Sequence, residues 1–166
     1  MRSNDTKNAV EAIDGFLTSA PPAAEAQRFE MIKFQVLASD SAFFDQASQY
    51  ALKLLAKEGY DADAANDLTW TIYELAESGD FENQDVLKAA LTLASKGVEM
   101  SDASLKPYIM DTVAHLELFV GDHERALRTQ REAYRIANEI QKPKLIDFLK
   151  ELESLADPKT ENSKDK

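Results

Sequence analysis

Two stretches of this sequence repeat one pattern: a large and a small residue in a first helix, a Gly-Asp turn, and two small residues seven positions apart in a second helix. The first copy consists of Leu68-Thr69-Trp70, Gly79-Asp80, Ala90 and Gly97. The second copy consists of Val113-Ala114-His115, Gly121-Asp122, Ala126 and Ala133. Small residues at these positions let two antiparallel helices approach closely, and stacked helix pairs bury one continuous core. The pattern therefore predicts a helical-repeat fold with an extended surface.

The composition favours helix throughout and argues against several kinds of site. Of the 166 residues, 44% are hydrophobic, and glycine and proline number only five each. The net charge of −11 disfavours binding to nucleic acid and to anionic membrane surfaces. The chain has no cysteine, which excludes disulfides, thiolate zinc sites and thiol catalysis. No apolar run has the length of a signal-peptide core or a membrane span, so we expect a soluble chain whose compartment and oligomeric state stay open.

Hydrophobic periodicity predicts about eight antiparallel helices and no strands. Their expected ranges are residues 6–19, 23–39, 42–57, 63–77, 85–99, 104–120, 123–140 and 143–156. Residues 1–5 and the acidic and lysine-rich tail, residues 157–166, are expected to be disordered. The sequence thus predicts an all-α, right-handed helical-repeat solenoid over residues 6–156, with three helix pairs and a flanking helix at each end.

The second copy of the pattern resembles the tetratricopeptide repeat. Val113-Ala114, Gly121-Asp122, Ala126 and Ala133 fall at the usual spacings of that repeat. The chain departs from it at Glu117, where the repeat has an aromatic residue, and Pro143 comes later than the proline that normally closes the unit. The resemblance implies a TPR-like fold in which the first helix of each pair lines a concave face.

Four groups of short motifs carry a narrower resemblance that covers most of the chain. They are Ala12-Ile13-Asp14-Gly15-Phe16-Leu17, Lys33-Phe34-Gln35-Val36-Leu37, Asn66-Asp67-Leu68-Thr69-Trp70, and Asp111-Thr112-Val113-Ala114 followed by Gly121-Asp122 and Gln130. These segments resemble the helical-repeat region that follows thioredoxin-like domains in some bacterial redoxins, notably those of planctomycetes. The redoxin part has no counterpart here, since the chain contains no Cys-x-x-Cys motif. The resemblance implies a helical accessory or interaction module and carries over no catalytic residue.

The candidate partner-binding site is a ladder of side chains on the predicted helices 63–77 and 104–120. Its members are Asn66, Trp70, Tyr73, Tyr108, Asp111, His115 and Leu118. Such a mixture of aromatic, amide and acidic groups can hold an extended peptide or a partner's helix, with Trp and Tyr as anchors. The alternative is that Trp70 fills the core between helix pairs. The Lys and Asn cluster of chaperone-tail-binding repeats is missing, so a C-terminal carboxylate ligand is not predicted.

A second interpretation makes the same region a metal or acid–base site. Asp111 and His115 share a helix face, and Asp122, His123 and Glu124 lie nearby in sequence. With 30 acidic residues in the chain, however, a histidine falls near carboxylates by chance, and we favour a salt-bridged or groove-lining His115. No phosphate loop, nucleophile elbow or His-Glu-x-x-His motif is found. We therefore expect no enzyme activity, no cofactor and no metal.

Two functions remain after these exclusions. The first is a non-catalytic module that binds a protein or peptide partner in a concave groove. The second is a structural accessory domain that packs on a thioredoxin-like redoxin, in cis or in trans, through an apolar patch. An upstream Cys-x-x-Cys domain in a longer gene would favour the second function.

The repeat pattern leads to a first testable prediction. Ala90→Glu places a charge where two helices are expected to approach closely, so the variant is expected to lose the repeat fold. Circular dichroism and thermal melting measure this outcome. Wild-type helicity and melting in the variant would show that the repeat register is wrong.

Overall fold

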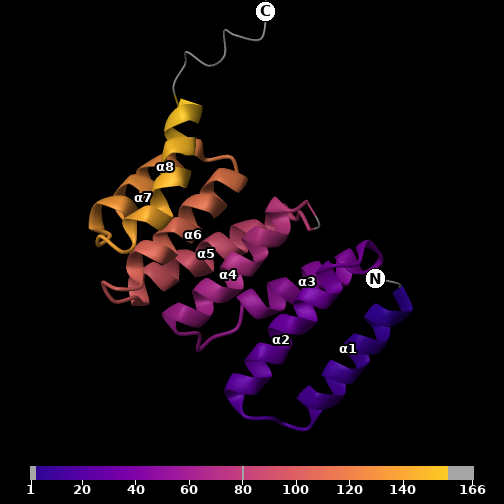
Figure 1. The fold of residues 1–166 in the computed structure, drawn as a ribbon. Helices are drawn as coiled ribbons and strands as arrows, with labels where there is room; N and C mark the ends of the chain where they lie inside the picture. Colours follow the sequence, from indigo (N-terminus) through magenta and orange to yellow (C-terminus); the bar gives the residue numbers. More distant parts are fainter. Residues whose placement is uncertain (1–2, 80, 157–166) are drawn as a thin grey trace, which may run out of the picture.

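The computed structural model describes residues 3–79 and 81–156, and these residues form α-helices joined by short turns, with no strand among them (Figure 1). The elements are α1 Ser3–Thr18, α2 Ala23–Ala38, the 3-10 turn η1 Ser41–Phe43, α3 Phe44–Leu55, α4 Ala62–Glu77, α5 Gln84–Met100, α6 Lys106–Phe119, α7 His123–Ile136 and α8 Lys142–Ala156. The predicted all-α class is confirmed. The predicted tail, residues 157–166, lies outside the described residues, as do residues 1 and 2.

Most helix boundaries differ from the predicted ones by one to four residues, as three of them illustrate. Residues 3–5, expected to be disordered, belong to the first turn of α1. The third helix is preceded by the turn η1, because the Asp40 carboxylate accepts the Ala42 N–H (3.1 Å) and also the Thr6 hydroxyl (3.0 Å). The seventh helix ends at Ile136 instead of 140. The Asn138 side chain closes a turn there by accepting the Ile140 N–H at 2.9 Å.

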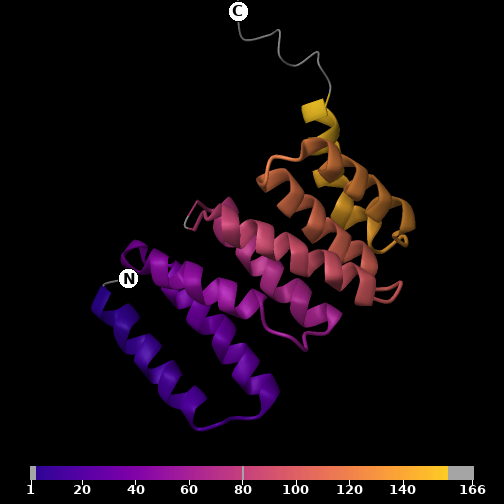
Figure 2. The ribbon, with the colours of Figure 1, turned by 180° about the vertical axis from the view of Figure 1, so that it is seen from behind.

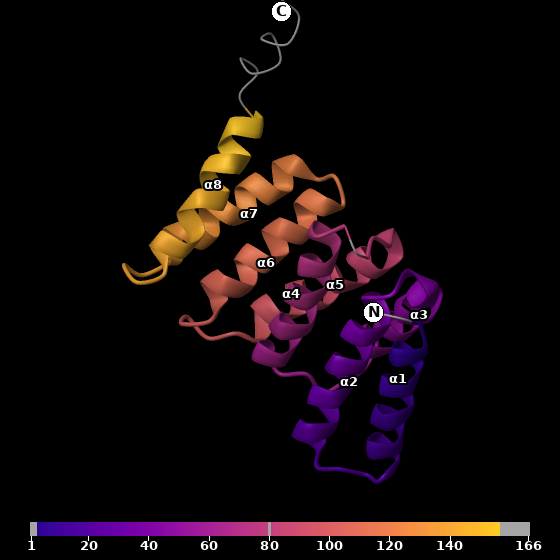
Figure 3. The ribbon, with the colours of Figure 1, turned by 45° about the vertical axis from the view of Figure 1, so that its right-hand side comes forward.

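Each helix packs against the next one along the chain over most of the molecule, and some contacts skip a helix. They include the contacts of α3 with α5, of α4 with α6 and of α6 with α8 (Figure 3). Seen from behind, the α1–α2 hairpin and the α7–α8 hairpin lie at opposite ends of the molecule (Figure 2). The largest core cluster runs from α2 to α6 and includes Phe34, Leu68, Ile72, Leu87 and Leu116. Two smaller clusters hold α8 against α6 and α7.

Gly97 marks the closest approach of three helices. A Cβ atom added to it would lie 3.3 Å from Ile109 Cγ2 on α6 and 3.7 Å from Ala65 Cβ on α4. Ala90, seven residues earlier on α5, is fully buried. The small residues that the repeat pattern singled out on α5 therefore lie in closely packed interior positions.

Glu117 is buried at the end of α6. Its carboxylate is 2.6 Å from the Arg125 guanidinium across the turn to α7. Burial raises the pKa of Glu117, while the Thr129 hydroxyl and Arg125 act in the opposite direction. An ion pair with Arg125 thus offsets part of the cost of burying the Glu117 carboxylate.

Among the described residues, no helix combines the length and the apolar character that crossing a bilayer requires.

Two glycines in helix interiors provide a matched test of the packing. Gly97→Leu is expected to lower the free energy of unfolding by about 1–3 kcal/mol, because the new side chain collides with α4 and α6. At Gly15 an added Cβ atom would meet nothing within 4 Å, so Gly15→Leu is expected to raise that free energy by about 0.5–1 kcal/mol. Urea denaturation followed by circular dichroism measures both changes. Equal effects at the two positions would contradict the close approach at Gly97.

Candidate functional site

Two adjoining pockets lie between alternate helices. The first, about 530 Å³, lies between α2 and α4, and the second, about 450 Å³, lies between α4, α6 and α8. Trp70 of α4 lines both pockets. It is half-buried, with part of its ring packed against the main core. The two interpretations of Trp70, core residue and surface anchor, therefore each describe one part of the same side chain.

Four of the seven candidate residues line the second pocket: Asn66, Trp70, Tyr108 and Asp111. The remaining lining residues are Leu105, Thr112, Lys144 and Leu145. Thr112 donates a hydrogen bond to the Asn66 side-chain oxygen (2.8 Å), which fixes α6 against α4 at the pocket wall. These four candidate residues, from α4 and α6, thus line one cavity, and α8 forms its third wall.

The other three candidates, Tyr73, His115 and Leu118, pack in the interior beside α8. The His115 ring stacks on Phe148 with centroids 3.5 Å apart, and Tyr73 lies 4.4 Å from His115. Leu118 joins the cluster that contains Phe148. The sequence predicted residues 143–156 only as a flanking helix, so this part of the α6 surface was expected to be open. Because Phe148 covers it, these three residues support the pocket wall instead of lining the pocket.

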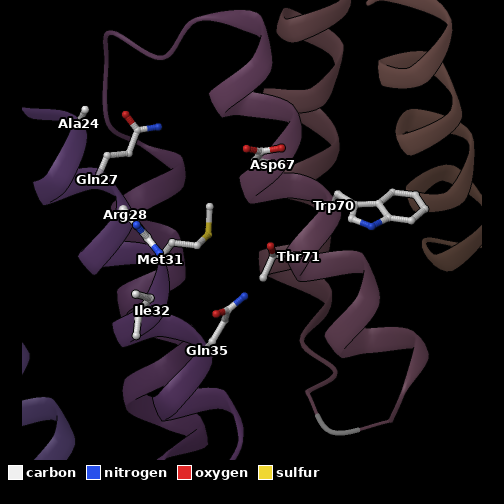
Figure 4. A pocket seen from close by; sticks show the side chains of 9 residues that line it. All are labelled: Ala24, Gln27, Arg28, Met31, Ile32, Gln35, Asp67, Trp70 and Thr71. Carbon is white, nitrogen blue, oxygen red and sulfur yellow. The ribbon is translucent and has the colours of Figure 1, made fainter.

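The pocket between α2 and α4 was missed from the sequence. Figure 4 shows Met31 and Gln35 of α2 facing Asp67 and Thr71 of α4, while the Trp70 indole extends away from α2. Met31 and Gln35 lie four residues apart on one helix face. That spacing was the available signal, but the candidate residues were chosen only from the helices predicted at residues 63–77 and 104–120.

Gln130 of α7 connects two of the three helices around the second pocket, α6 and α8, and is fully buried. Its side-chain amide donates to Asp111 Oδ1 (2.5 Å) on α6 and to the Leu145 carbonyl oxygen (3.1 Å) on α8. A polar residue on the inner face of an amphipathic helix is a recognisable sequence signal. The partner of that residue, however, is decided by tertiary packing.

Asp111 and His115 have shifted acidities because both are largely removed from water. Burial raises the pKa of Asp111 to about 6, with the Gln130 hydrogen bond acting in the opposite direction. Burial lowers the pKa of His115 to about 4. The nearest nitrogen–oxygen distance between them is 3.9 Å, which is too long for a hydrogen bond. At neutral pH the imidazole is therefore uncharged and the carboxylate is ionised.

The described residues contain no group of three or more His, Asp or Glu side chains placed to hold a metal ion. Asp122 caps α7 by accepting the Arg125 N–H at 3.1 Å, and Glu124 pairs with Arg128 at 2.6 Å. His123 is exposed. The three residues that the metal hypothesis grouped with Asp111 and His115 thus have other surroundings.

A scan against protein-family models and searches of curated proteins and of solved structures found no match for this chain.

The pKa values of Asp111 and His115 shift in opposite directions on folding, which predicts how the stability of the protein depends on pH. Between pH ~4 and ~6 the folded chain holds a proton on Asp111 that the unfolded chain releases, so this residue lowers the free energy of unfolding as the pH rises. Between pH ~4 and ~6.5 the unfolded chain holds a proton on His115 that the folded chain lacks, so this residue raises the free energy of unfolding as the pH rises. The two slopes oppose each other in the wild type.

Single substitutions separate the contributions of the two residues to the pH dependence of the free energy of unfolding. Relative to wild type, Asp111→Asn is expected to gain stability, and His115→Gln to lose it, as the pH rises from about 4.5 to about 6.5. Each difference is on the order of 2–3 kcal/mol over this window. Urea denaturation at the two pH values measures them. Parallel pH profiles for all three proteins would contradict the burial of both groups.

Proposed function

We propose that this chain is a non-catalytic, TPR-like helical-repeat module that binds a protein or peptide partner on the face formed by α2, α4, α6 and α8. The observation that carries the proposal is the meeting of two pockets at Trp70, a half-buried aromatic residue on that face. Alternate helices provide the walls of both pockets. A partner that spans them would contact four helices at once.

The helix contacts support a right-handed solenoid of the TPR type. In a stack of helix pairs, the first helices of successive pairs touch one another, and so do the second helices. The contacts of α4 with α6 and of α3 with α5 follow this rule. The close packing at Gly97 is of the kind that such stacking needs.

The chemistry of the pockets suits a peptide better than a small apolar ligand. Trp70 and Tyr108 offer aromatic surfaces, the usual anchors of protein interfaces. Asn66, Gln35 and Asp67 supply amide and carboxylate groups that can pair with a peptide backbone or with polar side chains. This combination of aromatic and polar groups is typical of surfaces that recognise extended chains.

A separate surface favours a second candidate, an accessory domain that packs on a thioredoxin-like redoxin in cis or in trans. Leu52 on α3 and Met100 at the end of α5 are 38% and 51% exposed. Shallow cavities of about 310 Å³ each lie between these helices, lined by Leu55, Leu93 and Lys96 among others. An exposed apolar strip of this kind fits a flat docking contact.

Two double variants distinguish the functions. Trp70→Ala/Tyr108→Ala alters the face between alternate helices, whereas Leu52→Ala/Met100→Ala alters the strip on α3 and α5. His115 is left intact because it packs on Phe148 in the interior. Circular dichroism checks that each variant is folded before affinity capture from a bacterial lysate, with captured proteins identified by mass spectrometry.

If the proposal holds, capture of a specific partner falls about tenfold or more for the Trp70/Tyr108 variant and is unchanged for the Leu52/Met100 variant. The reverse result, with a redoxin among the captured proteins, would support the accessory-domain function. A partner captured equally by both variants would refute the proposed binding face.

A further inference from the structure

We propose that the pocket between α4, α6 and α8 receives a cationic side chain, an arginine or a lysine, from the partner peptide. This inference rests on the proposed function, because it specifies which peptide chemistry the Trp70 face recognises. Three features of the pocket carry it: an unneutralised carboxylate, two aromatic walls and a resident cation.

The carboxylate belongs to Asp111. Its side chain is 15% exposed, yet the residue lines the pocket. Within the described part of the chain its nearest basic group is His115, at 3.9 Å, and burial keeps that imidazole neutral at pH 7. The Asp111 carboxylate thus has a hydrogen bond from Gln130 but no cation to balance its charge. A partly desolvated carboxylate of this kind gains most from an incoming charged donor.

The aromatic walls are Trp70 and Tyr108, on opposite helices of the pocket. Guanidinium and ammonium groups bind favourably over such rings, and indole is the strongest of them. Arginine suits the site particularly well, since its planar group can stack on an aromatic ring while its N–H groups pair with a carboxylate. The cavity of about 450 Å³ is within the size range of ligand pockets.

The resident cation is Lys144 of α8. Its ammonium nitrogen lies 5.2 Å from the centre of the Tyr108 ring. No carboxylate in the described residues forms an ion pair with it within 4.0 Å, so the ring is the partner that accounts for its position. The chain therefore already places one cation at the pocket wall. The net charge of −11 adds a long-range attraction for basic segments.

Selection from a phage-displayed library of random peptides tests the inference with the full chain. The library is selected in parallel on wild type, Trp70→Ala, Asp111→Asn, Lys144→Ala and Asp147→Asn. Asp111→Asn removes the pocket charge while keeping the oxygen that accepts the Gln130 amide. Asp147→Asn removes the same charge from an exposed position on α8 and is the matched control. Circular dichroism confirms that each variant is folded.

The expected result is about tenfold enrichment of arginine or lysine at one peptide position on wild type and on Asp147→Asn, with loss of that enrichment on Asp111→Asn. In Lys144→Ala the enrichment is expected to persist or to rise, because the competing cation is gone. Loss of the basic enrichment in Lys144→Ala would show that Lys144 does not compete with the peptide's basic side chain, and it would overturn the cation pocket.

The remaining outcomes separate this inference from the proposed function. Peptides that require Trp70 but show no basic preference, or keep that preference on Asp111→Asn, would overturn the cation pocket and leave peptide binding in place. A selection with no Trp70-dependent peptide at all would overturn the cation pocket and count against the binding face as well.

Discussion

Three helices of this protein meet at Gly97, and the stacking of the central helices depends on how closely they approach there. The position of a missing Cβ lies 3.3 Å from Ile109 Cγ2, so even an alanine at this position requires the Ile109 side chain to shift. Alanines fill the corresponding contacts along the stack and are fully buried: Ala47, Ala51, Ala65, Ala90, Ala94, Ala114, Ala126 and Ala133. Helices that pack on small residues come close enough to exclude water, and their larger side chains occupy the other faces.

The placement of those larger side chains produces the two pockets. Trp70 and Tyr108 are only partly buried, and both lie on the face formed by α2, α4, α6 and α8. Farther along the same side, Phe148 of α8 closes the gap by stacking on His115. The last helix is therefore both the end of the core and one wall of the candidate site. Gln130 holds this arrangement by bonding to α6 and α8 simultaneously.

Helix periodicity and turn residues predicted the elements closely, because both are local properties. Gly79 and Gly121, both with positive φ, directly follow the C-caps of α4 and α6, where the Gly-Asp turns were expected. The end of α7 was placed four residues too late, since Ile140 continues the apolar period while the Asn138 turn breaks the helix. Asn66, Trp70, Tyr108 and Asp111 line one pocket because α4 and α6 lie side by side.

The sequence by itself determined the helices, their turns and the small residues at which they approach, because each follows from the period of 3.6 residues and from side-chain size. Only the tertiary structure decided which side chains stay open to a partner. Tyr73 on α4 and His115 and Leu118 on α6 were expected to line the same surface as Trp70 and Asp111. Instead Phe148 stacks on His115 and packs near Leu118, and Tyr73 packs against His115. The packing of α8 also sets the acidity of Asp111 and His115, because it removes water from both. Such burial depends on residues far apart in the chain, which no local pattern encodes.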